Sequence, residues 1–109
     1  MPEEQNQSLE PHTLAKIDTL IHTPARLSVM AYLYVVDSMD FVYLKRMTGL
    51  SSGNLSVHLS KLEEGGYVLI HKSFLEKKPH TMIILSDKGR VAFKDYKDEL
   101  QKTLGSLPD

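Results

Sequence analysis

A short helix bounded by glycines, residues 52–64, most constrains what this chain can fold into. Gly49 ends the helical pattern before it, because a C-terminal cap favours the left-handed backbone that glycine adopts readily. Ser51 or Ser52 then supplies an N-cap, and Gly65-Gly66 stops the helix sharply. Two short helices joined across three residues have the length and punctuation of a helix-turn-helix.

Two further helices are expected before this motif. Apolar residues spaced by three and four over residues 9–21 predict a first helix. Thr23-Pro24 stops it and caps a second helix that runs to Val36. We expect its buried stripe to consist of Leu27, Met30, Ala31 and Tyr34. Residues 37–40 are interpreted as a polar connection, whose Asp40 caps the helix that ends at Gly49.

The hydrophobic period changes after Gly66. Tyr67–Phe74 and Thr81–Leu85 are rich in β-branched and aromatic residues, and the polar residues Glu76–His80 lie between them, which predicts a β-hairpin. Ser86 then caps a final helix from Asp87 to about Leu104. Its expected apolar stripe is Phe93, Tyr96, Leu100, Leu104 and Leu107. The predicted fold class is α+β, mainly helical.

Length and composition are those of one small globular domain. We expect residues 1–8 to form a flexible tail and residues 9–109 a single domain, because 109 residues fit one compact core. The absence of cysteine excludes disulfides and thiolate chemistry. No apolar run approaches the roughly 20 residues that cross a bilayer, and the start of the chain is acidic rather than signal-like. These features predict a cytoplasmic protein that does not bind membranes.

The charged residues are distributed unevenly along the chain. The formal net charge is only −1, which does not by itself indicate a nucleic-acid partner. Residues 1–40 carry two basic and six acidic side chains, whereas residues 41–80 carry six basic and three acidic ones. The helix-turn-helix and the hairpin are therefore the basic part of the chain, and binding to phosphate there should be sensitive to salt.

The predicted helix 52–64 has two chemically different faces. Its leucines at 55, 59 and 62 face inward, and the opposite face presents Ser52, Asn54, Ser56, Val57, His58 and Lys61. With Gly53, these side chains make a slim face that fits the DNA major groove, where Asn54 can pair with an adenine edge. Capping alone accounts for Ser51 and Ser52, but Asn54 and Ser56 lie past the cap. His58 is left open between DNA contact and packing over the adjoining helix.

The basic residues of the hairpin follow directly behind this helix. Lys77, Lys78 and His80 lie in the connection and Lys72 on the strand before it, while Lys45 and Arg46 precede the turn. Lysines on a hairpin are often only solubility devices. In this position we interpret the group as contacting phosphate. The residues expected to contact DNA are Lys45, Arg46, Ser51, Ser52, Asn54, Ser56, His58, Lys61, Lys72, Lys77, Lys78 and His80.

Several of these runs resemble known regulators. They are Pro24–Leu27, Phe41–Lys45, Thr48–Ser51, Gly53–Leu59, Leu62-Glu63, Gly65–Val68 and Leu85–Arg90. Together they look like the winged helix-turn-helix transcriptional regulators of the MarR and ArsR groups, over about residues 14–100. The resemblance implies a three-helix core, a hairpin wing over residues 75–80, a C-terminal helix for dimerisation and a prokaryotic regulator. The chain is shorter than full-length MarR proteins and lacks the cysteines of metal-sensing ArsR proteins, so their ligand pocket and metal chemistry are not carried over.

A homodimer is expected because the last helix is longer than the core of a small domain needs. We expect Tyr96, Leu100 and Leu104 to pair across a two-fold axis with Leu14, Ile17 and Ile21 of the first helix. Such a dimer places two reading helices about 34 Å apart, one turn of DNA. The predicted function is a sequence-specific regulator, more often a repressor, that binds a palindromic operator in double-stranded DNA.

Other chemistries find no support in the residue pattern. The five histidines show no metal-binding spacing, although His12 and His22 across a dimer stay open, and no catalytic constellation or cofactor loop occurs. We therefore predict no enzyme activity, no metal and no cofactor. Arg26, in the first turn of its helix, is expected to pair with a carboxylate such as Glu63. Two alternatives remain: a protein-interaction module, which the slightly acidic total charge favours, and a sensor with a small-molecule effector at the dimer seam, for which no polar anchor is identified.

Overall fold

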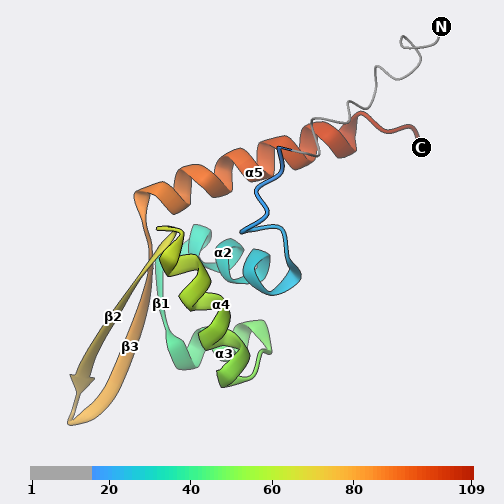
Figure 1. Ribbon diagram of the computed structural model, residues 1–109. Helices are drawn as coiled ribbons and strands as arrows, with labels where there is room; N and C mark the ends of the chain where they lie inside the picture. Colours follow the sequence, from blue (N-terminus) through green and yellow to red (C-terminus); the bar gives the residue numbers. More distant parts are fainter. Residues whose placement is uncertain (1–15) are drawn as a thin grey trace, which may run out of the picture.

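The computed structural model describes residues 16–109, and Figure 1 shows their arrangement. The elements in chain order are α2 (Pro24–Val36), β1 (Ser38–Asp40), α3 (Phe41–Thr48), α4 (Ser52–Glu64), β2 (Val68–Leu75), β3 (Lys78–Leu85) and α5 (Asp87–Gly105). The predicted class is confirmed: helices predominate, and the sheet has three antiparallel strands in the order β1-β3-β2. Within residues 16–109, no helix is long and apolar enough to cross a membrane.

The helix boundaries are set by the capping residues that the sequence predicted. The hydroxyls of Thr23, Ser51 and Ser86 accept backbone N–H groups of α2, α4 and α5. The Asp40 carboxylate accepts the Tyr43 N–H of α3 at 2.8 Å. Of the two serines considered for α4, the cap is Ser51. Each cap satisfies a donor that the first helical turn leaves free.

Gly49 performs the function predicted for it between α3 and α4. Its φ is 74°, in the left-handed region, and its N–H donates to the Lys45 carbonyl at 2.9 Å. A residue with a Cβ would be strained in this conformation. The chain therefore reverses within Gly49–Ser51 and starts α4 directly, which is the helix-turn-helix connection.

The stretch after α2 is a strand, not the polar connection predicted. Ser38, Met39 and Asp40 pair with Ile84, Ile83 and Met82 of β3, and Met39 is buried. β1 thus pairs with the backbone of β3 on the side that β2 leaves open. Asp37, with φ 71°, turns the chain from α2 into this strand.

The hairpin is longer and its turn tighter than predicted. Only Glu76 and Lys77 form the turn, with positive φ values of 53° and 67°, as in the type I′ turns that suit twisted hairpins. Lys78, Pro79 and His80 belong to β3, where they pair with Leu75, Phe74 and Ser73. The predicted five-residue connection was therefore wrong, because the two strands continue up to the two-residue turn.

Residues 16–22 form turns rather than the end of a helix. The Asp18 carboxylate accepts the N–H groups of Leu20 and Ile21 and also a hydrogen bond from the Tyr67 hydroxyl. Burial is the larger cause, and this bond to Asp18 the next, of a rise in the pKa of Tyr67 to about 12. The first-helix prediction is thus wrong for residues 16–21, and residues 9–15 lie outside the described part of the chain.

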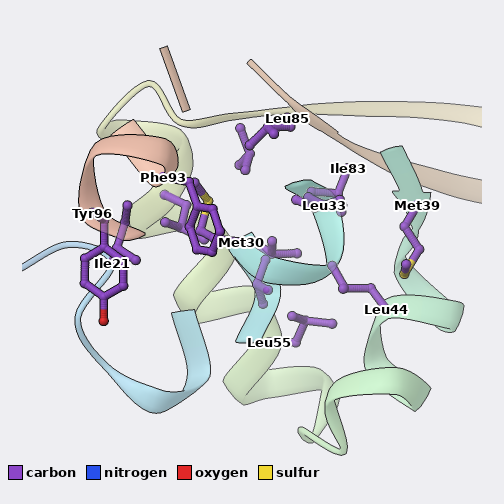
Figure 2. Close-up of a cluster of buried hydrophobic side chains, with 14 of the residues drawn as sticks. Ile21, Met30, Leu33, Met39, Leu44, Leu55, Ile83, Leu85, Phe93 and Tyr96 are labelled. Atoms are coloured by element: carbon purple, nitrogen blue, oxygen red, sulfur yellow. The ribbon is translucent and has the colours of Figure 1, made fainter. Parts of the chain in front are cut away.

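The core lies where α2, α3, α4 and the sheet meet the start of α5 (Figure 2). Its fully buried side chains include Ile21, Met30, Leu33, Leu44, Leu55, Leu62 and Ile83. The stripe predicted for α2 was partly wrong: Met30 is buried, but Val29 and Leu33 replace the half-buried Leu27, Ala31 and Tyr34 as its other buried residues. The inward face of α2 is thus turned relative to the one predicted.

The stripe of α5 also departs from the prediction near its end. Phe93 and Tyr96 are buried and Leu100 is half-buried, as an inward stripe requires. The next inward residue is Thr103, whereas Leu104 is 55% exposed. The C-terminal turns of α5 extend beyond α2 (Figure 1), and Leu104 on these turns is exposed.

Candidate nucleic-acid interface

The outward face of α4 is uncovered by the rest of the described chain. Leu55, Leu59 and Leu62 are buried, whereas the predicted contact residues Ser52, Asn54, Ser56 and Lys61 are all exposed. Helical geometry separates the two groups, since residues at i, i+4 and i+7 share one face. The condition on which the DNA-binding prediction depends, an accessible Asn54 and Ser56, is met.

The N-terminus of α4 is an accessible group of backbone donors. The Ser51 hydroxyl accepts the Asn54 N–H at 3.1 Å, and Ser51, Ser52 and Gly53 are all exposed. A helix N-terminus carries partial positive charge and suits a phosphate group. In Figure 1 the start of α4 and the tip of the hairpin lie on the side of the molecule away from α5.

His58 and Arg26 form a contact between α4 and α2. Arg26 donates through Nε to the Leu20 carbonyl, and its Nη1 lies 3.1 Å from His58 Nδ1. Since a guanidinium only donates, Nδ1 accepts and the proton of a neutral His58 sits on Nε2. Burial, the Arg26 charge and the Lys61 charge all lower the pKa of His58. The expected Arg26–Glu63 pair is thus replaced by Leu20 and His58, and His58 packs against the adjoining helix segment.

Ser56 and Lys72 come together at a groove between α4 and the hairpin. The groove has a volume of about 270 Å³ and is lined by Phe41, Ser56, Leu59, Ser60, Ile70, Lys72, Thr81 and Ile83. Its apolar lining comes from Phe41, Leu59, Ile70 and Ile83, and its polar lining from Ser56, Ser60, Thr81 and Lys72. The structure therefore brings a predicted residue of the helix and one of the hairpin to a common surface.

The remaining predicted residues of the hairpin are divided between its two faces. Side chains alternate along a strand, so Lys72 and Phe74 share the face of Ile70, whereas Lys78 and His80 lie on the opposite face. Lys77 occupies the turn, and His80 is half-buried. The basic side chains therefore surround the hairpin instead of forming one row.

Lys45 and Arg46 lie in the last turn of α3, directly before Gly49, and both are exposed. Basic side chains at this end also complement the negative end of the helix dipole. They extend the positive surface from the start of α4 toward α3. These two residues are placed as predicted.

One residue and one contact of this region were not predicted from the sequence. Phe74 is 75% exposed near the hairpin tip, on the face of Lys72, and pairs with Pro79. The alternation of strand residues could have placed it there. Arg26 holds His58 over a separation of 32 residues, and no local sequence signal reveals that contact.

The expected dimer residues are divided between the core and the surface. Ile17, Ile21 and Tyr96 are buried within the single chain, and Tyr96 bonds His22 Nδ1 through its hydroxyl at 2.8 Å. Leu100 is half-buried and Leu104 exposed, while Leu14 lies outside the described residues. Three of the six residues therefore serve the chain's own core and offer little surface to a partner.

The part of the chain from residue 16 onward holds no cluster of three or more histidine or acidic side chains arranged to bind a metal ion. His22, one of the two histidines considered for a site across a dimer, bonds Tyr96 instead. His12, the other, lies outside the described residues.

Comparison with known proteins shows the family of this chain. The family model of the winged helix DNA-binding domain matches residues 25–104, which include α2 to α5 except the first residue of α2 and the last residue of α5. The chain belongs to the winged helix DNA-binding domain family. It is thus a DNA-binding protein of the kind found among transcriptional regulators, and the predicted winged helix-turn-helix fold is confirmed.

Relatives and solved structures agree with this assignment. An uncharacterized protein of Methanocaldococcus jannaschii is 42% identical over 77 residues, which is 71% of this chain and 84% of the relative. A transcriptional regulator homologue of Pyrococcus horikoshii superposes with a TM-score of 0.85 at 25% identity, covering 90% of this chain and 99% of that one. A MarR-family regulator of Silicibacter pomeroyi has the same fold, with a TM-score of 0.59 at 19% identity over 94% and 64% of the two chains. The chain therefore shares its fold with a regulator of the MarR family.

Proposed function

We propose that this winged helix protein is a sequence-specific transcriptional regulator that places α4 in the major groove and uses the β2–β3 hairpin, with residues 75–80 at its tip, as a wing. The observation that carries the proposal is the exposed face of α4. An α-helix enters the groove only where its outer side chains are short and can exchange hydrogen bonds with base edges. Ser52, Asn54 and Ser56 meet that requirement.

Base reading and backbone positioning fall to different residues. Asn54 can donate and accept at an adenine edge, and Ser56 can bond either a base or a phosphate. His58, held by Arg26, presents Nε2–H as a donor only. The N-terminus of α4 and the side chains of Lys45, Arg46, Lys61, Lys72, Lys77 and Lys78 supply phosphate contacts. Affinity should therefore fall steeply as salt is added.

The active species proposed is a homodimer on a palindromic operator. In this proposal residues 9–109 act as one domain, and the C-terminal part of α5 forms the dimer contact through Leu100 and Leu104. A two-fold dimer brings two α4 helices to successive major grooves. We propose repression as the outcome.

Selection from random DNA duplexes, followed by gel shifts, tests the proposal. The purified protein should enrich a palindromic sequence. The triple variant Asn54→Ala, Ser56→Ala, Lys78→Ala should lose binding to it while its thermal unfolding stays unchanged. Lys94→Ala is a matched control, because Lys94 is an exposed lysine of α5 that pairs with Asp98. Failure of the wild-type protein to bind any DNA at low salt would reject the function.

One observation favours a second function, a protein-interaction module. Phe74 and Leu75 are both largely exposed at the end of the hairpin, and aromatic side chains are enriched in protein interfaces. In that case Phe74→Ser should abolish capture of a partner protein, and the triple variant should retain it. The two functions are thus separated by which set of residues matters.

A further inference from the structure

Val57 is an apolar side chain at the centre of the proposed reading face. It is 54% exposed and lies on the side of α4 opposite Leu55, Leu59 and Leu62. The side chains around it are polar and exposed: Asn54, Ser56, Ser60 and Lys61. A β-branched residue is also less favourable in an exposed helix position than an unbranched one. Neither core packing nor helix propensity therefore explains a valine here.

Gly53 lies one helical turn before Val57. As with the valine, the fold of the chain gives no reason for a glycine at this position. Its φ lies outside the left-handed region, and a Cβ added to it meets nothing within 4 Å. Glycine within a helix is less favourable than alanine, so the fold itself gains nothing from it. Gly89 in α5 is the opposite case, because a Cβ there would collide with the Tyr67 carbonyl. The missing side chain at position 53 thus points to a neighbour outside this chain.

Resting on the proposed function, we infer that Gly53 and Val57 form an apolar strip that seats on the 5-methyl group of a thymine in each half-site. Gly53 lets the start of α4 approach the base pairs closely, and the Val57 isopropyl group then meets the methyl group. In the major groove that methyl group is the apolar feature of the base pairs, and it distinguishes thymine from cytosine. Operator choice then depends on this apolar contact as well as on hydrogen bonds from Asn54.

Replacing thymine with deoxyuridine tests the contact, since this change removes only the methyl group. The probe is the duplex that the wild-type protein selects, with each thymine pair replaced symmetrically in turn. At one position the wild-type protein should lose about fourfold in affinity per half-site, the value of one buried methyl group. Val57→Ala should bind the thymine duplex more weakly and no longer distinguish it from the deoxyuridine duplex.

Two controls connect the effect to this strip. Val91→Ala changes an exposed valine of α5 and should keep the full preference for thymine. Gly53→Ala should weaken binding to the thymine duplex and reduce the preference for it over the deoxyuridine duplex, while its melting temperature equals or exceeds that of the wild type. A lower melting temperature for Gly53→Ala would mean that the fold requires this glycine, which overturns its part in the inference.

The outcomes separate this inference from the function on which it rests. If no sequence is enriched, the proposed function itself is overturned. If a sequence is enriched but no thymine replacement alters affinity, or Val57→Ala retains the same preference for thymine, the methyl contact is overturned and the function stands. An enriched half-site without thymine overturns the contact in the same way.

Discussion

Arg26 of α2 contributes to the chemistry of a residue on α4, the helix proposed to read DNA. It ties the Leu20 carbonyl to His58, so the turn before α2 and the middle of α4 are held together. Burial and the charge of Arg26 both lower the pKa of His58, because protonation would place a second cation in a partly buried site against the guanidinium. Folding and the proton on His58 are therefore linked.

The linkage predicts how stability depends on pH. The folded-state pKa of His58 lies below its ordinary value of 6.5, so near and below that value the unfolded chain binds more protons. The free energy of unfolding should consequently fall as the pH drops from 7.5 to 5.5. In His58→Gln this loss should be smaller, since the glutamine oxygen can accept from Arg26 without titrating. Urea unfolding at both pH values measures the difference, and an equal loss in both proteins would contradict it.

Two helical glycines give a contrasting pair of stability predictions. Gly89→Ala should lower the free energy of unfolding by about 2–3 kcal/mol, because its Cβ meets the rigid backbone of Tyr67. Gly53→Ala should raise it by up to about 1 kcal/mol, because the site is open and alanine favours a helix. Urea denaturation of the two variants side by side provides the measurement. Equal effects of the same sign would show that the surroundings of the two glycines do not decide the outcome.

At the level of the elements, the wing turn keeps residues that its backbone does not favour. Glu76 and Lys77 both have positive φ, a conformation that asparagine and glycine tolerate better. Such a conformation persists where the surrounding structure imposes it, and it often marks a functional position. Lys77 at the turn is consistent with the proposed phosphate contact.

The turn therefore offers a stabilising substitution. Glu76→Asn with Lys77→Gly should raise the free energy of unfolding by about 1 kcal/mol, since both new residues suit a type I′ turn. Glu76→Asn alone retains Lys77 and should give a smaller gain. Thermal unfolding measures stability, and gel shifts show whether only the double variant loses affinity for DNA. A destabilised double variant would mean that the Glu76 or Lys77 side chain holds the wing.

The predictability of each element follows from how local its signals are. The ends of α2, α3, α4 and α5 were predictable because each cap is a short-range contact between neighbouring residues. β1 was missed because Ser38–Asp40 is only three residues long and exists through its pairing with β3. Residues 16–21 have helical spacing, but the Asp18 carboxylate bonds the backbone in turns instead.

The candidate site was predictable in its exposed part and not in its contacts. The slim face of α4 follows from helical periodicity alone, which placed Asn54 and Ser56 outside. The partner of Arg26 was mispredicted, because a carboxylate is the usual expectation while the fold places His58 there. The choice of Thr103 over Leu104 on α5 likewise depends on packing between distant segments.

Across the whole molecule, the proposed DNA surface and the proposed dimer contact lie at different sides. The start of α4 and the hairpin tip lie away from α5 (Figure 1), so a partner on the end of α5 would leave both free. The basic segment 41–80 coincides with α3, α4 and most of the hairpin. A second copy joined through α5 would therefore present two such surfaces to one duplex.

Leu104 is the residue on which this arrangement can be tested. It is exposed near the end of α5, and Leu107, whose backbone N–H donates to the Leu104 carbonyl at 3.2 Å, is a second exposed leucine at this end. A charge placed there would have to be desolvated in a dimer but costs little in a monomer.

Leu104→Glu should therefore sediment as a monomer at micromolar concentration, where the wild type sediments as a dimer, with thermal unfolding of its domain retained. Val91→Glu, at an exposed valine on the other half of α5, should stay dimeric. A wild-type monomer at this concentration would remove the dimer, and a dimeric Leu104→Glu would move the interface elsewhere on the chain.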